Sequence, residues 1–559
     1  MKNTTPILSV QNLSIAFGKQ TVVHDLSFEV FSDEIVGVVG ESSSGKSVTA
    51  LSIMGLLPKG NKHIQKGSIR FEAMDLHMLS TDEFKSLRGN QISMIFQEPM
   101  SALNPSMRCG NQILEAILLH TSLTKKAAKE EVLRLMELVQ LPDPNISFSK
   151  YPHQISGGQQ QRIMIALAIA CQPKLLIADE PTTALDVTVQ KEIISLLKDI
   201  QKKTKMAMLF ITHDLDLVSE IADRLLVMHQ GKLVEQGLAS SIFKSPKETY
   251  TQGLLGARPP MKKRPLRLPT VADSMDEKIS IAFETKKARN EKHKKIYCQP
   301  PILEAVHLKK EFMTPIGWLG ENSRFTAIND VNFKLFPGET LGLVGESGCG
   351  KSTLAKAILQ LESLEEGTIL YEGIDIKKLK GKALKKFRKE VQLVFQDPFA
   401  SLNPSIRIGK AIMEPMRVHK MYATQKQRKE KTLELLQKVG LESIHFDRYP
   451  HEFSGGQRQR INIARALALE PKIIVCDESV SALDISVQAQ ILNLLNDLKD
   501  QFGFAYLFIS HDLSVVRYMS DHLMVMKQGR MIEHGEADSV FSNPKNNYTQ
   551  QLLAAIPSV

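Results

Sequence analysis

The sequence predicts an α/β fold that is built twice, as two similar domains in tandem along 559 residues. The first observation behind this prediction is an internal repeat. Lys46 and Lys351 lie in matching contexts, and Ser156 recurs as Ser454, 298 residues later. The second observation is that in each copy a short apolar run leads into a glycine-rich loop and then into an apolar helical pattern. This order of elements is typical of open, mostly parallel sheets, so the chain is expected to carry the same site twice.

Composition indicates a soluble globular protein. Hydrophobic residues make up 43% of the chain and charged residues 24%, and its length predicts two to four domains. The apolar runs stop well short of the roughly 18 residues that a membrane-spanning helix needs. The N-terminus has no apolar stretch of the signal-peptide type. Five scattered cysteines form no C-x-x-C pair, which favours neither a disulfide framework nor a zinc site. A reduced, cytosolic chain is expected.

A basic, proline-rich segment lies between the two copies. Residues 256–300 contain 12 Lys/Arg and 5 Asp/Glu, so they hold +7 of the chain's net charge of +10. The rest of the protein carries only +3, which argues against a nucleic-acid-binding function. The segment is interpreted as a linker, either a solvated tether or a tether that lies against anionic lipid headgroups.

Each copy contains a candidate phosphate-binding loop. The apolar runs 35–40 and 340–345 are typical of strands buried on both faces, and they lead into GESSSGKS (40–47) and GESGCGKS (345–352). In such a loop the backbone N–H groups surround a β-phosphate, the lysine reaches the β- and γ-oxygens, and the serine hydroxyl binds Mg²⁺. The candidate nucleotide-binding residues are Gly40, Ser42, Ser43, Ser44, Gly45, Lys46 and Ser47 in the first copy, and Gly345, Ser347, Gly348, Cys349, Gly350, Lys351, Ser352 and Thr353 in the second.

Two acids and a histidine follow further along each copy. The runs KLLIADE (174–180) and KIIVCDE (472–478) each predict a strand with an acid pair at its carboxyl end, where ligands bind in open α/β sheets. The first acid of each pair can hold Mg²⁺ and the second can take a proton from an attacking water. A histidine after one further strand is interpreted as a γ-phosphate sensor. These candidates are Asp179, Glu180 and His213 in the first copy and Asp477, Glu478 and His511 in the second.

The sequence SGGQ occurs in both copies between the loop and the acid pair. With the motifs above, it makes the chain resemble two fused nucleotide-binding domains of an ABC transporter, and the resemblance covers nearly everything except the linker. In that family two domains pack head to tail, so that the signature of one closes over the nucleotide bound by the other. A serine and glycines at a helix start leave N–H groups free for the triphosphate. The signature residues are Ser156, Gly157, Gly158 and Gln159, and Ser454, Gly455, Gly456 and Gln457.

The resemblance implies roles for further residues. Gln97 and Gln396 are similar to glutamines that touch Mg²⁺ and the attacking water beside a groove for a membrane subunit. Phe17 and Phe312 stand where the family stacks an aromatic ring on adenine, and residues 183–186 and 481–484 match its D-loop. Each domain is expected to have a mostly parallel α/β core, an antiparallel β subdomain and an α-helical insertion (110–150 and 408–448). The expected boundaries are 6–256 for the first domain, 257–300 for the basic linker and 301–559 for the second domain.

The end of each copy narrows the resemblance. SPKETYTQGLL (245–255) and NPKNNYTQQLL (543–553) resemble the tails of dipeptide/oligopeptide importer ATPases. That family implies ATP and Mg²⁺ as cofactors, and two transmembrane permease subunits and a solute-binding protein as partners. It also implies a peripheral location on the cytoplasmic face of the inner membrane, with no nucleic acid bound. The solute stays open among dipeptides, oligopeptides, glutathione, peptide antibiotics and nickel. A soluble tandem ABC ATPase acting on ribosomes or DNA, and a sugar importer, are the alternatives.

Some residues depart from the family pattern. Ser43 stands where a glycine is usual, Ser479 where a proline is usual, and Ile155 where a leucine is common. If the backbone at Ser43 needs a positive φ, the serine costs on the order of 1 kcal/mol. Neither tail is followed by the cysteines that hold an iron–sulfur cluster in some relatives, so no such cluster is expected.

Overall fold

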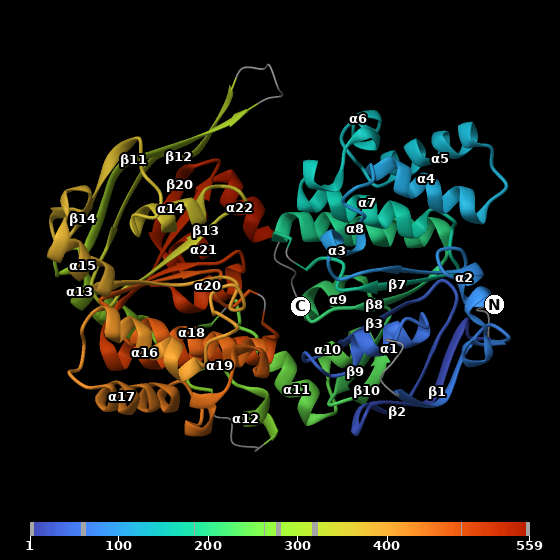
Figure 1. The fold of residues 1–559 in the computed structure, drawn as a ribbon, viewed down its shortest axis with the longest axis horizontal. Coiled ribbons are helices and arrows are strands. Elements are labelled where there is room, and N and C mark those ends of the chain that lie inside the picture. The colour runs from blue at the N-terminus through green and yellow to red at the C-terminus, as the bar shows by residue number, and fades with distance from the viewer. Residues whose placement is uncertain are drawn as a thin grey trace. The chain divides into compact units, whose positions relative to one another are not determined.

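The computed structural model describes residues 5–57, 63–183, 185–261, 263–275, 281–315, 322–481 and 483–554. These residues form two compact units: 5–255 with 271–275, and 256–270 with 281–554. Each unit contains a four-stranded antiparallel sheet and a six-stranded, mostly parallel sheet with helices around it (Figure 1). The predicted fold class is therefore confirmed in both units.

The antiparallel sheet of the first unit has the order β2-β1-β4-β5, and its six-stranded sheet has the order β10-β9-β3-β8-β7-β6. All neighbours in the second sheet pair in parallel except β9 and β10. The strands are β1 (Leu8–Phe17), β2 (Gln20–Val30), β3 (Ile35–Gly40), β4 (His63–Phe71), β5 (Met74–Asp75), β6 (Ile92–Ile95), β7 (Leu175–Asp179), β8 (Ala207–Ile211), β9 (Arg224–His229) and β10 (Lys232–Leu238).

The helices of the first unit include the expected α-helical insertion, which is formed by α4, α5 and α6 and lies at the far end of the unit from β1 and β2 (Figure 1). The helices are α1 (Lys46–Ile53), α2 (Thr81–Leu87), α3 (Pro99–Ala102), α4 (Cys109–His120), α5 (Lys125–Leu138), α6 (Pro144–Ser149), α7 (Gly157–Ile169), α8 (Val187–Thr204), α9 (Leu215–Ile221), α10 (Ala239–Lys244), α11 (Thr249–Gly256) and α12 (Val271–Met275), with 3₁₀ turns at Leu76–Met78 and Pro152–Gln154.

The second unit repeats this plan, with the sheet orders β12-β11-β14-β15 and β16-β17-β18-β13-β19-β20. Its strands are β11 (Leu303–Pro315), β12 (Asn322–Leu335), β13 (Thr340–Val344), β14 (Glu366–Tyr371), β15 (Ile374–Asp375), β16 (Val391–Val394), β17 (Ile473–Asp477), β18 (Ala505–Ile509), β19 (His522–Lys527) and β20 (Arg530–Glu536). Its helices are α13 (Lys286–Tyr297), α14 (Lys351–Ile358), α15 (Gly381–Glu390), α16 (Ile408–Val418), α17 (Gln425–Lys438), α18 (Gly455–Leu467), α19 (Ile485–Phe502), α20 (Leu513–Met519), α21 (Ala537–Ser542) and α22 (Asn547–Ala554), with 3₁₀ turns at Ile376–Lys378, Ser443–Asp447 and Pro450–Glu452.

The central strands are buried because both faces of each six-stranded sheet are covered. One face packs against the antiparallel sheet and the helix that follows the phosphate loop, and the other face packs against helices. Strand β3 is buried at every residue, as its uninterrupted apolar sequence predicts. Strand β8, with the sequence AMLFI, is likewise fully buried. Over the part of the chain that the structure describes, no helix is long and apolar enough to cross a membrane.

The basic segment between the two copies is not a solvated tether over its described residues. Ala257 and Leu268 are buried in the hydrophobic core of the second unit. The backbone of Leu268 exchanges two hydrogen bonds with the side-chain amide of Asn493, at 2.9 and 2.8 Å. We call residues 256–270 and 281–300 the docked linker. The expectation of a flexible tether is wrong for these residues, because the linker packs as part of the second unit.

Buried cations of the docked linker find acceptors on the second unit. Arg264 donates to the carbonyl oxygens of Tyr518 and Ser520 at the end of α20, at 3.0 and 2.9 Å. Arg289 lies 2.8 Å from Glu536, and Lys292 lies 2.8 Å from the buried Asp521. The net charge of the linker had suggested solvation, but Arg264, Arg289 and Lys292 are paired with acids more than 200 residues away in the sequence.

The first unit lacks three of the side-chain acceptors that the linker uses. The positions 298 residues before Asn493, Glu536 and Asp538 are occupied by Ser195, Leu238 and Ser240. A serine or leucine there cannot form the paired amide or carboxylate contacts that the linker makes. The sequence of the second copy therefore selects it as the docking surface.

Candidate nucleotide-binding sites

Each phosphate loop joins a buried strand to the start of a helix. Gly45 is the N-cap of α1 and Gly350 the N-cap of α14, with φ values of 94° and 106°. A glycine cap brings no side chain to the first N–H groups of the helix, which leaves them available to an anion. Gly40, with φ 150°, has no room for a side chain, since a Cβ there would meet the backbone oxygen of Met228 at 2.1 Å. The loop thus has the close backbone approach that a triphosphate requires.

The two loop lysines have the same contacts. The ammonium of Lys46 donates to the carbonyl oxygens of Gly40 and Glu41, both at 2.8 Å. Lys351 donates to those of Gly345 and Glu346 at 2.7 and 2.8 Å. Both lysines are buried, so each positive charge is held at the mouth of its loop by backbone oxygens.

The departure at Ser43 has a structural consequence. Ser43 has a φ of 65°, in the left-handed region, and its counterpart Gly348 has a φ of 78°. A Cβ added at Gly348 would meet nothing within 4 Å. The loop therefore needs a positive φ at this position, as expected. The cost of the serine comes from its backbone and not from crowding.

The loop serine and the first acid of each pair lie side by side. Ser47 donates to Asp179 at 3.1 Å, and Ser352 donates to Asp477 at the same distance. Burial is the largest influence on Asp179 and raises its pKa to about 6, although the hydrogen bond from Ser47 lowers it. Burial likewise raises the pKa of Asp477. A hydroxyl and a carboxylate together fit Mg²⁺, which prefers a few oxygen ligands and keeps the rest for phosphates and water.

Glu180 is surrounded by hydrogen-bond donors. It accepts from Gln97 at 2.8 Å and from the hydroxyl of Thr183 at 2.9 Å, and it lies 3.2 Å from Nδ1 of His213. Burial alone would raise the pKa of Glu180, but the hydrogen bond and charge of His213, together with Thr183, lower it to about 2. The carboxylate is therefore ionised, and its backbone φ of 48° projects it from the end of β7.

The second site repeats this cluster with one difference. Gln396 donates to Glu478 at 2.8 Å, and His511 lies 3.4 Å from the same carboxylate. Burial alone would lower the pKa of His511, but its hydrogen bond to Glu478 raises it. Ser481, in the place of Thr183, donates to the backbone oxygen of Glu478 and not to its carboxylate. The carboxylate of Glu180 therefore has three side-chain partners, and that of Glu478 has two.

The signature serines begin helices. Ser156 is the N-cap of α7, where its hydroxyl accepts from the N–H of Gln159, and the Gln159 side chain accepts from the N–H of Ser156. Ser454 and Gln457 form the same reciprocal pair at α18. This reciprocal pair is a capping box, and it fixes the helix start in both units.

The two glycines of each signature have different surroundings. A Cβ at Gly157 would have one neighbour within 4 Å, a leucine side chain at 4.0 Å. A Cβ at Gly455 would likewise have one, a leucine side chain at 3.9 Å. A Cβ at Gly158 would meet Val189 at 3.0 Å, and one at Gly456 would meet Val487 at 2.3 Å. The first glycine therefore leaves the helix start open, whereas the second lets the helix pack closely.

The two aromatic residues predicted to stack on adenine, Phe17 and Phe312, lie in the first strand of each unit. Phe17 ends β1 and packs partly against the first unit's core, and Phe312 lies in β11 with the ammonium of Lys310 5.0 Å from its ring. The sequence analysis placed Thr183 in the D-loop but missed its hydrogen bond to Glu180. Its position three residues after Glu180 was the available signal. The segments 183–186 and 481–484 each include one residue outside the described part of the chain.

A groove of about 240 Å³ lies next to Gln396 in the second unit. It is lined by Leu361, Phe395 and Pro415, of which Leu361 is 62% exposed and Phe395 43% exposed. Phe387 and Arg388 of α15 form another part of its wall. An apolar groove with exposed rims beside a catalytic-site loop is suited to receive a partner.

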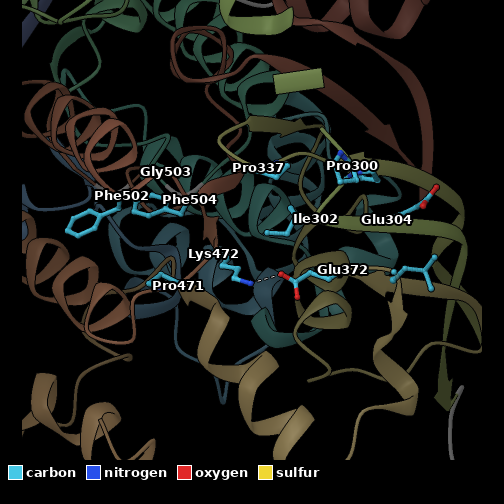
Figure 2. Close-up of a pocket in the computed structure, with 13 residues that line it drawn as sticks. Pro300, Ile302, Glu304, Pro337, Glu372, Pro471, Lys472, Phe502, Gly503 and Phe504 are labelled. Carbon is cyan, nitrogen blue, oxygen red and sulfur yellow. Dashed lines mark hydrogen bonds and ion pairs between the residues drawn. The ribbon is translucent and has the colours of Figure 1, made fainter. Parts of the chain in front are cut away.

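A larger cavity of about 690 Å³ lies elsewhere in the second unit. Figure 2 shows its lining, with Pro471 and Lys472 before β17, Phe504 before β18, and the ion pair between Lys472 and Glu372. These residues lie at the amino ends of the parallel strands. The phosphate loops and acid pairs lie at the carboxyl ends, so this cavity is not part of the nucleotide site.

Comparisons with known proteins agree with this geometry. The family described as ABC transporter matches residues 23–183 and 328–481, and the family described as oligopeptide/dipeptide transporter, C-terminal region, matches residues 234–281 and 532–559. The chain is 45% identical to the glutathione import ATP-binding protein GsiA of Pectobacterium atrosepticum and 46% identical to that of Escherichia coli O157:H7. Each alignment covers 99% of this chain and 89% of the relative. Among solved structures, the ATP-binding cassette MJ0796 in a dimeric post-hydrolysis state matches with 28% identity and a TM-score of 0.38, over 42% of this chain and 98% of that chain.

Proposed function

Since this chain belongs to the ABC transporter ATP-binding proteins and powers import by hydrolysing ATP, we propose that its solute is glutathione or a closely similar short peptide. The observation that carries the solute proposal is the similarity to glutathione import proteins over both domains and the linker. The match to the importer C-terminal region favours this function over a soluble tandem ATPase acting on ribosomes or DNA.

We assign the steps at the first site to five residues. Lys46 and the N–H groups at the start of α1 bind the phosphates, and Ser47 and Asp179 hold Mg²⁺, which neutralises charge on the triphosphate. Glu180 accepts the proton of the attacking water, and His213 donates to the γ-phosphate. In the present arrangement His213 is instead paired with Glu180. Nucleotide binding therefore has to exchange that contact for one to phosphate, which restores basicity to the carboxylate.

We further propose that each site is completed by the signature of the other domain. Residues 454–457 include no lysine, arginine or carboxylate and offer an open helix start at Gly455. Such a start stabilises negative charge but cannot hydrolyse ATP by itself. The site containing Lys46 would therefore use Ser454 and Gly456, and the site containing Lys351 would use Ser156 and Gly158.

This chain supplies the ATPase activity of an importer, and the importer family implies that its partners are membrane permeases. We propose that one permease subunit docks in the groove beside Gln396, and that a solute-binding protein delivers the solute. The chain would then work as a peripheral protein on the cytoplasmic face of the inner membrane. It would bind no nucleic acid and no iron–sulfur cluster.

Two matched variants test the composite sites. Ser454→Ala should impair nucleotide trapping at the site containing Lys46, and Ser156→Ala should impair trapping at the site containing Lys351. Photo-crosslinking of a nucleotide analogue followed by peptide mapping assigns the trapped nucleotide to one domain. If Ser454→Ala damages only the site of its own domain, the composite arrangement is refuted.

A transport assay tests the solute. The chain, its two permeases and a binding protein are reconstituted in vesicles, and uptake is measured for labelled glutathione, a dipeptide and Ni²⁺. Glutathione uptake that depends on ATP and is lost in a Glu180→Gln/Glu478→Gln variant is expected. Uptake of the dipeptide or of Ni²⁺ without glutathione uptake would refute the solute proposal and leave the ATPase function standing.

A further inference from the structure

A concentrated positive charge lies in the second domain, outside the sites described above. Residues 377–389 contain eight Lys/Arg and no Asp/Glu. The corresponding residues of the first domain, 77–89, contain two of each kind and have no net charge. The charge is therefore a property of one domain and not of the shared fold.

Helix α15 turns most of this charge toward solvent. Phe387 is buried and Leu384 half-buried, which fixes the inner face of the helix. Residues that follow at helical spacing on the opposite side are Lys382, Lys385, Lys386 and Lys389, which we call the lysine face. The first three are exposed and the fourth is half-buried. Three more exposed lysines, Lys377, Lys378 and Lys380, lead into the helix.

The charge of the lysine face is scarcely neutralised. Of its four members, ion pairs within the described chain are recorded only for Lys386, with Glu372 at 3.9 Å and Glu390 at 3.8 Å. The positive potential reaches the neighbouring helix α16. The pKa of His419 at its end is lowered by burial first and then by the charges of Lys385 and Lys389.

The lysine face lies beside the groove proposed for the permease. Phe387 and Arg388, on the same helix, form part of the wall of that groove together with Phe395. A subunit that docks there is embedded in the membrane. This step rests on the proposed function. A permease docked in the groove would bring the outer side of α15 next to the membrane surface.

The composition of the lysine face favours lipid over protein as its partner. Protein interfaces are depleted in lysine and enriched in arginine and aromatic residues, whereas seven of the eight cations in residues 377–389 are lysines. A planar layer of anionic headgroups needs no matching shape, and juxtamembrane lysines are attracted to it additively. We infer that the lysine face of α15 binds the anionic lipid headgroups of the membrane beside the permease, and so orients the second domain.

Vesicle co-sedimentation of the full-length protein without permeases tests this inference. The probes are vesicles of phosphatidylcholine alone or mixed with phosphatidylglycerol. The test variant is K382Q/K385Q/K386Q/K389Q. The matched control is K286Q/K287Q/K294Q/K295Q on α13, which removes the same charge from exposed lysines of the docked linker.

The wild-type protein is expected to bind the anionic vesicles and not the neutral ones, less strongly at high salt. The α15 variant should lose about tenfold or more in binding, and the α13 control should keep it. Equal loss in both variants would show that net charge alone acts, and unchanged binding in the α15 variant would show that the face is not used. Either result overturns the inference, as does an α15-dependent binding to a short RNA that exceeds binding to vesicles.

ATPase activity of the same preparations separates this inference from the proposed function. The lysine face does not touch the nucleotide residues, so both variants should hydrolyse ATP at the wild-type rate. If the wild-type protein hydrolyses ATP but does not bind the anionic vesicles, the lipid contact is refuted and the proposed function stands. Failure of hydrolysis in the wild-type protein would concern the proposed function.

Discussion

Replacing Ser43 by glycine should tighten ATP binding at the first site. Ser43 holds a φ of 65°, where a side chain costs on the order of 1 kcal/mol relative to glycine. The bound loop must keep this conformation because the N–H groups around the phosphates depend on it, while the free loop can relax. If about 1 kcal/mol of the cost is recovered on binding, the affinity rises about fivefold, and by tenfold at most.

The assay is titration of the full-length protein with a fluorescent ATP analogue and Mg²⁺. Lys351→Ala silences the second site, so the titration reports the first, with and without Ser43→Gly. The reciprocal change is Gly348→Ser in a Lys46→Ala background, where the dissociation constant should rise by a similar factor. A Cβ at Gly348 would meet nothing within 4 Å, so this change tests the backbone without adding a clash.

Two results would refute the reasoning in different ways. Dissociation constants that stay within twofold in both experiments, with unchanged unfolding midpoints in urea, would show that the serine causes no strain. A gain in stability of Ser43→Gly without a gain in affinity would show that free and bound loops carry the strain equally. The affinity claim would then be wrong although the strain is present.

Three other predictions concern the acids and the docked linker. Glu180→Gln should slow hydrolysis at the first site about 100-fold or more while ATP still binds, as single-turnover assays and titrations can measure. Because burial raises the pKa of Asp179 to about 6 from 3.8, its charge destabilises the fold increasingly as the pH rises from 4 to 6. Asp179→Asn should therefore raise the unfolding temperature at pH 8 but not at pH 4. The same variant should abolish hydrolysis. An equal change in unfolding temperature at both pH values would contradict the first expectation. Asn493→Ala should destabilise the second unit by about 2 kcal/mol in urea, since two hydrogen bonds to Leu268 are lost, whereas Ser195→Ala should change little.

The sequence was sufficient to predict which residues of the candidate nucleotide sites lie together, because their geometry is local or set by strand order. The loop 40–47 forms its cradle from consecutive residues, and the run 174–180 ends at the same sheet edge because β3, β8 and β7 are parallel neighbours. Ser47 and Asp179 therefore meet although 132 residues separate them. A positive φ at Ser43 was considered as a condition, because a glycine is usual there in the family, and the structure has this φ.

The docked linker could not be predicted, because its contacts are neither local nor part of a repeated motif. A count of charges treats Arg264 and Arg289 as solvated, although both are largely buried. Apart from Glu284, their acidic partners lie more than 200 residues later, and in the sequence these partners look like surface acids. The roles of the site residues in hydrolysis and the exact domain boundaries stay predictions.

The docked linker also sets an order of events during synthesis. Leu268 leaves the ribosome 225 residues before Asn493, which receives it, and at about 5–20 residues per second that delay lasts about 10–45 s. Residues 5–255, which hold both sheets of the first domain, are complete before that delay begins. The linker must stay unpaired while almost the whole second domain is made. A chain that ends before residue 493 therefore keeps this basic segment, with its apolar Leu268, undocked, where chaperones and proteases can recognise the chain as incomplete.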